Sequence, residues 1–109
     1  TNNVLIAILN STWCQIQYEQ LGTVMGGGAL KLEAVQLRKV KIPNFAEPTL
    51  TKLNRYGEEL CRSKISESSE IINKINLCLL MSFIDDKERA RQLLAELKQK
   101  LQHYKEARQ

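Results

Sequence analysis

The sequence has few of the residues from which metal and nucleophilic sites are built. It holds one histidine and three cysteines among 109 residues. Cys14, Cys61 and Cys78 are widely spaced, form no Cys-x-x-Cys pair, and lie far along the chain from His103. Zinc sites and disulfide frameworks need closer spacings, so we expect buried free thiols in a reducing compartment. A lone histidine near a polar helix end also gives little support to a Ser-His-Asp or Cys-His arrangement.

Long apolar runs are also absent. The longest, Val4–Leu9 and Leu77–Met81, are far shorter than the roughly 20 residues that a membrane-spanning helix needs. The first run lacks the basic flank and the small-residue cleavage site of a signal peptide. We therefore expect a cytoplasmic protein with no membrane partner. Since the chain begins at Thr1, directly ahead of an apolar run and without a methionine, we also expect it to be part of a longer protein.

Phosphate-binding glycine motifs and convergent acids are missing as well. Gly22 and Gly27 have the spacing of a P-loop, but Gly28 stands where that motif needs lysine. The acidic pair at 58–59 points in different directions on a helix, and the pair at 85–86 is explained by helix capping. The sequence thus predicts no catalytic residue, no metal ligand and no cofactor bound by these residues alone.

Positive charge, in contrast, is present and unevenly distributed. The net charge is +4, with basic segments at 31–42 and 87–109 separated by an acidic stretch. The first segment carries four basic side chains against the single acid Glu33, namely Lys31, Arg38, Lys39 and Lys41. Clustered lysine and arginine favour contact with phosphates, so this segment predicts nucleic-acid binding. The alternative is the solvated face of a strand. We interpret the segment 87–109 as a solvated helix surface.

Hydrophobic periodicity predicts an α+β, mainly α-helical fold with about four helices and a small two-strand element. The first helix is expected over 3–21, capped by Asn2 or Asn3 and ended by Gly22. Two more helices are expected after Pro48 and around the apolar stripe Ile71–Leu79. Residues 1–46 would hold the first helix, the glycine loop and the strands, and residues 47–109 the helical C-terminal region.

The last helix is expected to follow a capping box in which Asp85 is the cap. Its apolar residues step by four and three from Ala90 to Tyr104, as a coiled-coil seam does. Such a short seam also suits a helix that docks on its own domain, and both possibilities stay open.

Three consecutive glycines, Gly26, Gly27 and Gly28, predict a loop, because glycine loses the most backbone entropy in regular structure. Short strands are expected at 30–33 and 39–42, joined by a turn at 34–38. In the second strand Lys39 and Lys41 would project the same way. The loop is either a hinge between helix and strand or a place where backbone approaches DNA or a ligand closely.

Three motifs in a fixed order resemble a known family. They are Leu-Ile-Ala-Ile-Leu-Asn-Ser at 5–11, the glycine-containing loop, and Leu-Arg-Lys-Val-Lys-Ile-Pro at 37–43. This order resembles the C-terminal, target-recognition side of N6-adenine DNA methyltransferases of restriction–modification systems, especially the Taq-type and the fused restriction–methylation enzymes. The same order is also similar to the end of the target-recognition domains in type I specificity subunits. Val40-Lys41-Ile42-Pro43 stands where the family has a strand closing on Leu-Pro-Ile-Pro.

The resemblance implies a DNA-binding C-terminal fragment that helps to hold double-stranded target DNA, with the remainder of the parent methyltransferase as its partner. The family's catalytic Asn/Asp-Pro-Pro-Tyr/Phe motif and its glycine-rich S-adenosylmethionine motif do not occur in residues 1–109. Methyl transfer and its cofactor would then belong to another part of the parent. Lys31, Arg38, Lys39 and Lys41 would contact phosphates. The glycine loop, Gly26, Gly27 and Gly28, would let the backbone approach the DNA closely.

A function of another class is a helical protein–protein interaction or dimerisation module without DNA contact. The apolar stripes Ile71–Leu80 and Ala90–Tyr104 would then dock another subunit, or form a homodimer through the C-terminal helix. In that case the basic residues would only solubilise the protein. An independent enzyme is the third and least supported possibility.

Overall fold

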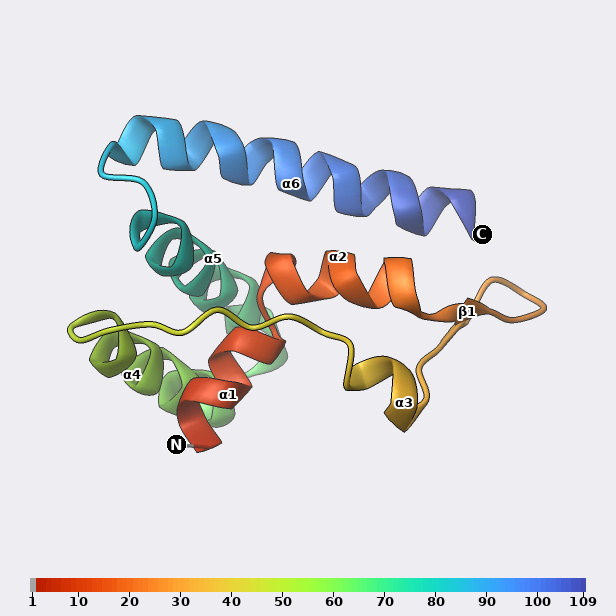
Figure 1. Ribbon diagram of the computed structural model, residues 1–109, viewed down its shortest axis with the longest axis horizontal. Helices are drawn as coiled ribbons and strands as arrows, with labels where there is room; N and C mark the ends of the chain where they lie inside the picture. Colours follow the sequence, from red (N-terminus) through yellow and green to blue (C-terminus); the bar gives the residue numbers. More distant parts are fainter. Residues whose placement is uncertain (1) are drawn as a thin grey trace.

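The computed structural model describes residues 2–109 as six helices and one two-stranded antiparallel sheet (Figure 1). The elements in chain order are α1 (Asn2–Leu9), α2 (Thr12–Leu21), β1 (Thr23–Val24), β2 (Leu30–Lys31), α3 (Ala34–Leu37), α4 (Thr49–Arg62), α5 (Ile65–Met81) and α6 (Lys87–Ala107). The predicted mainly helical α+β class is confirmed. The expected number of about four helices is too low, because one expected helix is divided and an expected turn is itself helical.

The division of the first expected helix occurs at Ser11. The hydroxyl of Ser11 donates to the Ile8 carbonyl at 2.6 Å, and its oxygen accepts the Cys14 N–H at 3.3 Å. Ser11 has extended backbone angles and is therefore the N-cap of α2, a role that serine fills well. A single helix over 3–21 is thus wrong, and Asn2 and Asn3 lie within α1 instead of capping it.

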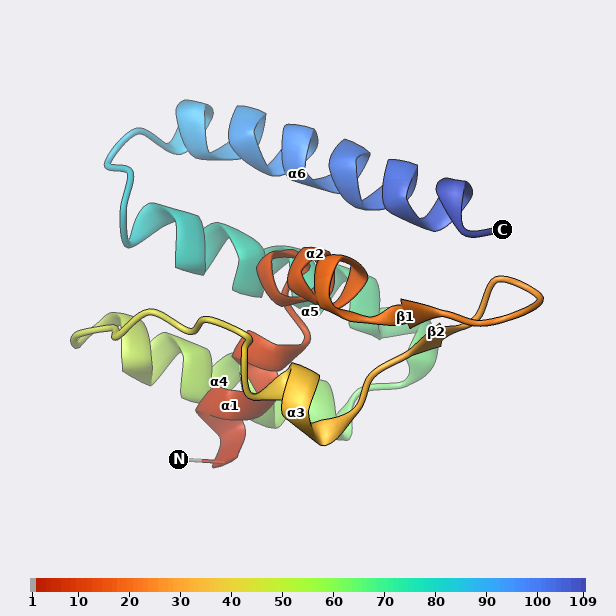
Figure 2. The ribbon, with the colours of Figure 1, turned by 45° about the vertical axis from the view of Figure 1, so that its right-hand side comes forward.

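The helices form three layers, best followed in Figures 1 and 2. One outer layer is α6, the middle layer holds α2 and α5, and the other outer layer holds α1 and α4. The buried cluster lies where α1, α4 and α5 meet, and consists of Ala7, Ile8, Cys14, Leu53, Ile75 and Leu79. Residues from both expected regions, 1–46 and 47–109, therefore share one core.

Helices α1 and α4 approach closely at Gly57. A Cβ added to Gly57 would overlap the backbone carbonyl of Asn3, so only glycine allows this crossing. Leu53 and Gly57 are buried, as the periodicity predicts for this helix. Cys61, expected as a buried thiol, is exposed in the last turn of α4.

The small sheet is a hairpin around the glycine loop. Thr23 pairs with Lys31, and Val24 pairs with Leu30. The expected partner strand at 39–42 is wrong, because the N–H groups of Lys39 and Val40 bond back to the carbonyls of Gln36 and Leu37 and extend the helical turn of α3. The predicted glycine loop is confirmed, and it connects two strands.

The N-cap of the last helix lies one residue later than expected. Asp86, instead of Asp85, accepts the N–H groups of Glu88 at 3.0 Å and Arg89 at 3.4 Å. Ala90 and Leu94 of α6 are buried against the chain itself, since α6 packs on α2 and α5. No helix among residues 2–109 is long and apolar enough to cross a membrane.

Candidate nucleic-acid interface

The glycine loop forms the tip of the hairpin, which extends from the body of the molecule beyond α2 (Figure 1). The Met25 N–H donates to the Ala29 carbonyl at 2.7 Å and closes the turn. Gly27 and Gly28 have φ of 87° and 88°, in the left-handed region that favours glycine. A Cβ added to Gly26 or Gly27 would meet no atom within 4 Å, so the backbone of these two residues faces open space.

Gly28 is different, because its close neighbour is the C-terminal end of the chain. A Cβ added there would overlap the carbonyl of Arg108, and Nη1 of Arg108 donates to the Gly28 carbonyl at 2.6 Å. Of the three glycines predicted to approach a ligand, only Gly26 and Gly27 are open to one. Sequence reasoning missed Arg108, and no local pattern marks it.

The four predicted basic residues are all exposed, but they do not share a strand. Lys31 lies on β2, Arg38 follows α3, Lys39 lies in the next turn and Lys41 in the extended segment after it. The expectation that Lys39 and Lys41 project the same way from a strand is therefore wrong. The four residues lie within one mostly exposed stretch of the chain, which we call the hairpin–α3 surface and define as residues 23–42.

Lys31 differs from the other three in its electrostatic environment. Its Nζ lies 3.4 Å from Oε1 of Glu33, and both side chains are exposed. Such an exposed pair contributes little to stability, but it competes with any other anion. Arg38, Lys39 and Lys41 form no ion pair with any residue that the structure describes. Three cations therefore remain unneutralised on this surface.

The backbone that carries Lys41 is held by α2. The Lys41 N–H donates to Oε1 of Gln17 at 2.7 Å. Its carbonyl accepts both Nε2 of Gln17 at 2.9 Å and Nε1 of Trp13 at 3.2 Å. Trp13 and Gln17 are four residues apart and so share one face of α2. These contacts orient the segment while the Lys41 side chain stays in solvent.

A second set of hydrogen bonds ties α3 to the hairpin. Oε1 of Gln36 accepts the Glu33 N–H at 2.8 Å, and Nε2 of Gln36 donates to Oγ1 of Thr23 at 3.3 Å. The first of these belongs to a capping box that starts α3. Lys31 on β2 and Arg38 after α3 are thereby placed on connected parts of the surface.

The hairpin–α3 surface also exposes apolar side chains. None of the residues of α3 is buried. Four large apolar side chains on β1, the loop and α3 are exposed, namely Val24, Met25, Val35 and Leu37. Exposed apolar groups among unpaired cations are typical of a surface that contacts another molecule.

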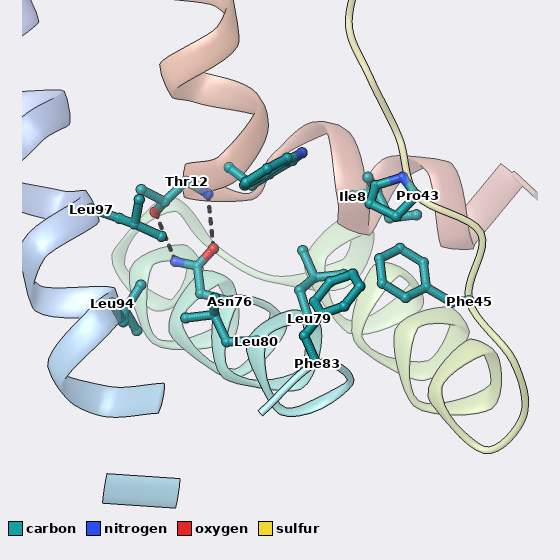
Figure 3. Close-up of a pocket in the computed structure, with 11 residues that line it drawn as sticks. Ile8, Thr12, Pro43, Phe45, Asn76, Leu79, Leu80, Phe83, Leu94 and Leu97 are labelled. Atoms are coloured by element: carbon teal, nitrogen blue, oxygen red, sulfur yellow. Dashed lines mark hydrogen bonds between the residues drawn. The ribbon is translucent and has the colours of Figure 1, made fainter. Parts of the chain in front are cut away.

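A small apolar cavity lies between α2, α5, α6 and the connector that contains Pro43 and Phe45 (Figure 3). Its volume is about 60 Å³, and its lining includes Leu80, Leu94 and Leu97. Thr12 and Asn76 lie at its edge and form two hydrogen bonds of 2.8 Å. The Asn76 side chain accepts the backbone N–H of Thr12 and donates to the Thr12 hydroxyl. Cofactor pockets are several times larger, so we interpret the cavity as a gap in the packing.

The titratable groups of the core are neutral under ordinary conditions. Burial raises the pKa of Cys14, against a smaller opposite effect of its hydrogen bond with Ser11. Cys14 is therefore a protonated thiol near neutral pH. It is a weak nucleophile in that form, because only the thiolate is strongly nucleophilic. Within residues 2–109, no group of three or more histidine, cysteine, aspartate or glutamate side chains is placed to hold a metal ion.

Comparison of the chain with family models, with curated proteins and with solved structures gives no match in any of the three. The resemblance to adenine methyltransferases therefore stays a prediction, and the geometry of the hairpin–α3 surface is the basis on which a function is argued.

Proposed function

We propose that this chain is a DNA-binding C-terminal part of an adenine-N6 DNA methyltransferase of a restriction–modification system, and that it helps to hold double-stranded target DNA in the cytoplasm. One observation carries the proposal: Arg38, Lys39 and Lys41 are exposed, form no ion pair with any of residues 2–109, and lie on a segment connected to an open glycine turn. S-adenosylmethionine and the methyl-transfer residues would belong to the remainder of the parent, which would be the protein partner.

The chemistry of the surface suits phosphates better than base edges. Lysine and arginine gain affinity for DNA by replacing condensed counterions, and such contacts position the duplex without reading its sequence. The hydrogen bonds from α2 hold the backbone at Lys41 before DNA arrives. Gly26 and Gly27 lack side chains, and a Cβ at either would meet open space, so a phosphate could approach their backbone closely. Lys31 contributes less, because Glu33 competes for it.

The test replaces Arg38, Lys39 and Lys41 with glutamine in one triple variant. A matched control replaces three exposed basic residues of α6 with glutamine and so removes the same charge. These residues are Arg91, Lys98 and Lys100. Affinity for a labelled duplex is measured over a range of salt concentrations. We expect the slope of log affinity against log salt to become less negative by about 2.7 in the first variant, at about 0.9 for each lost phosphate contact. The control should keep the original slope.

Two outcomes would contradict the proposal. An equal loss of affinity in both triple variants would show that net charge alone drives binding. Binding by the unmodified chain that does not depend on salt would exclude phosphate neutralisation.

The exposed apolar side chains of the hairpin–α3 surface favour a second candidate, a protein-interaction module without DNA contact. Val24, Met25, Val35 and Leu37 would then be covered by another protein or a second copy. A homodimer through α6 would have to use the outer side of that helix, since Ala90 and Leu94 are buried. Sedimentation separates the two arrangements: Val35→Lys should dissociate a complex formed by the hairpin–α3 surface, and Ala95→Lys, at an exposed position of α6, one formed by that helix. A complex dissociated by either change, with no DNA binding at any salt, would favour this candidate.

A further inference from the structure

A second basic site lies toward the opposite end of the long axis from the hairpin, where the connector enters α4 and where α6 begins (Figure 1). A groove of about 840 Å³ opens there. We call it the α4–α5 groove; its lining consists of residues 44–49 of the connector, Lys52 and Tyr56 of α4, Lys74, Leu77, Cys78 and Met81 of α5, and Ser82, Phe83 and Lys87 beyond it. A volume of this order is typical of ligand-binding sites.

The groove is positively charged. Lys52, Lys74 and Lys87 come from three different helices and line it together, and none forms an ion pair with a residue among 2–109. Among the lining residues the one acid is Glu47, whose carboxylate accepts a hydrogen bond from the hydroxyl of Thr51. Cations that converge from separate elements around one hollow create an attractive potential for an anion.

The three lysines do not contribute equally. Lys74 also lines a neighbouring depression, in which three acids, Glu59, Glu67 and Glu70, outnumber one further cation, Arg62. These acids weaken the potential near Lys74. Lys52 and Lys87 have no acid other than Glu47 in the same lining. We therefore assign the phosphate contacts to Lys52 and Lys87.

An aromatic side chain beside these cations is unusually open. Phe83 is 66% exposed, although a large apolar side chain gains free energy from burial. One side of its ring packs against Phe45, with centroids 5.9 Å apart and the planes at 59° (Figure 3). The exposed remainder of the ring adjoins the groove that Lys52 and Lys87 line. Tyr56 adds a second aromatic ring to the lining.

We propose that the α4–α5 groove binds single-stranded nucleic acid, with a base stacked on Phe83 and phosphates on Lys52 and Lys87. Proteins that hold single strands combine a positive groove with aromatic rings on which bases stack, and both components are present here. Duplex DNA keeps its bases stacked on one another and would leave Phe83 unused. An acidic peptide would use the lysines but has no need of a flat aromatic surface. This site is separate from the hairpin–α3 surface and does not depend on the function proposed for that surface.

The test measures the anisotropy of a labelled oligothymidine of about 12 nucleotides, a length within the site sizes of such grooves. Phe83→Leu keeps an apolar side chain but removes the ring, and should weaken binding by at least about 5-fold. Phe83→Tyr keeps the ring and should bind as the unmodified chain does. The double variant Lys52→Gln with Lys87→Gln should weaken binding by more than about 10-fold. It should also make the slope of log affinity against log salt less negative by about 1.4, at about 0.7 for each contact with a single strand.

The matched control is Lys98→Gln with Lys100→Gln, which removes the same charge from the exposed side of α6. It should bind the oligonucleotide normally. All of these positions are exposed, so the variants should fold, and circular dichroism verifies this. The triple variant of Arg38, Lys39 and Lys41 should also bind the oligonucleotide normally, which separates this site from the duplex surface.

Three results would overturn the proposal. One is equal weakening in the α6 control, and another is unchanged binding by Phe83→Leu. The third is competition by polyglutamate as strong as that by unlabelled oligothymidine, which would identify the groove as a site for an acidic protein.

Discussion

Arg108 and Glu19 join the C-terminal end of the chain to α2 through a bidentate ion pair. Nε and Nη2 of Arg108 lie 2.8 and 3.1 Å from the two carboxylate oxygens of Glu19. The Glu19 side chain is 5% exposed and that of Arg108 21% exposed, so the charges meet largely out of solvent. The hydrogen bond to Glu19 is the main cause that raises the pKa of Arg108 above its ordinary value. With its bond to the Gly28 carbonyl, Arg108 connects α6, α2 and the glycine turn.

Replacing Arg108 with alanine should therefore loosen the hairpin. We expect faster hydrogen exchange at the amides of Met25 and Gly28, whose hydrogen bonds close the turn, and a lower melting temperature. Arg108→Lys should restore the hairpin only in part, because lysine cannot form the bidentate pair. Arg89→Ala, at an exposed position of α6, is the control and should leave exchange in the turn unchanged. Unchanged exchange in Arg108→Ala would show that the turn is stable without the C-terminus.

Replacing Gly57 with alanine should push α1 away from α4. The added Cβ overlaps the backbone of Asn3, which a side-chain rotation cannot relieve. We expect the free energy of unfolding in urea to fall by about 1–3 kcal/mol, the usual range for overpacking. Gly26→Ala adds the same methyl group in open space and should change stability by no more than about 0.5 kcal/mol. Similar stability of the two variants would mean that the helix crossing adjusts freely.

Removing the Asn76 side chain should leave buried polar groups of Thr12 unsatisfied. Oδ1 of Asn76 accepts the Thr12 N–H, and Nδ2 donates to the Thr12 hydroxyl, in a place where both residues are buried. We expect Asn76→Ala to lower the free energy of unfolding by about 1–3 kcal/mol. A double-mutant cycle with Thr12→Ala should give a coupling energy of about 0.5–3 kcal/mol. Additive effects in the cycle would contradict direct pairing.

Tyr18 should make stability fall in alkaline solution. Burial, with smaller contributions from Cys14, raises the pKa of Tyr18 from 10.0 to about 12. Between these values the unfolded chain loses the phenol proton and the folded chain keeps it, so rising pH favours unfolding. The raised pKa of Cys14 acts in the same direction from pH 9.0 upward. Ultraviolet absorbance of tyrosinate should show a transition near pH 12 that Tyr18→Phe removes and Tyr104→Phe retains; a transition still present in Tyr18→Phe would assign it elsewhere.

Periodicity and local chemistry were enough to predict several features of this fold. The predicted apolar stripe Ile71–Leu79 faces the core, with Ile75 and Leu79 buried, because a helix turns the same face inward at every third or fourth residue. The glycines at 26–28 form a turn, in which the backbone of Gly27 and Gly28 adopts angles that other residues avoid. Gly22 ends its helix as predicted. The exposure of Arg38, Lys39 and Lys41 also follows from their charge.

Only the tertiary structure decided which segments meet. The partner of β2 lies before the glycines instead of after them, since the turn closes on Thr23 and Val24 while the residues after Leu37 bond back to α3. Glu19 and Arg108 are 89 positions apart and become neighbours only because α6 packs along α2. Lys52 and Lys87 likewise share a groove through the packing of three helices. Contacts between distant residues depend on how whole helices pack, and no local spacing in the sequence records that packing.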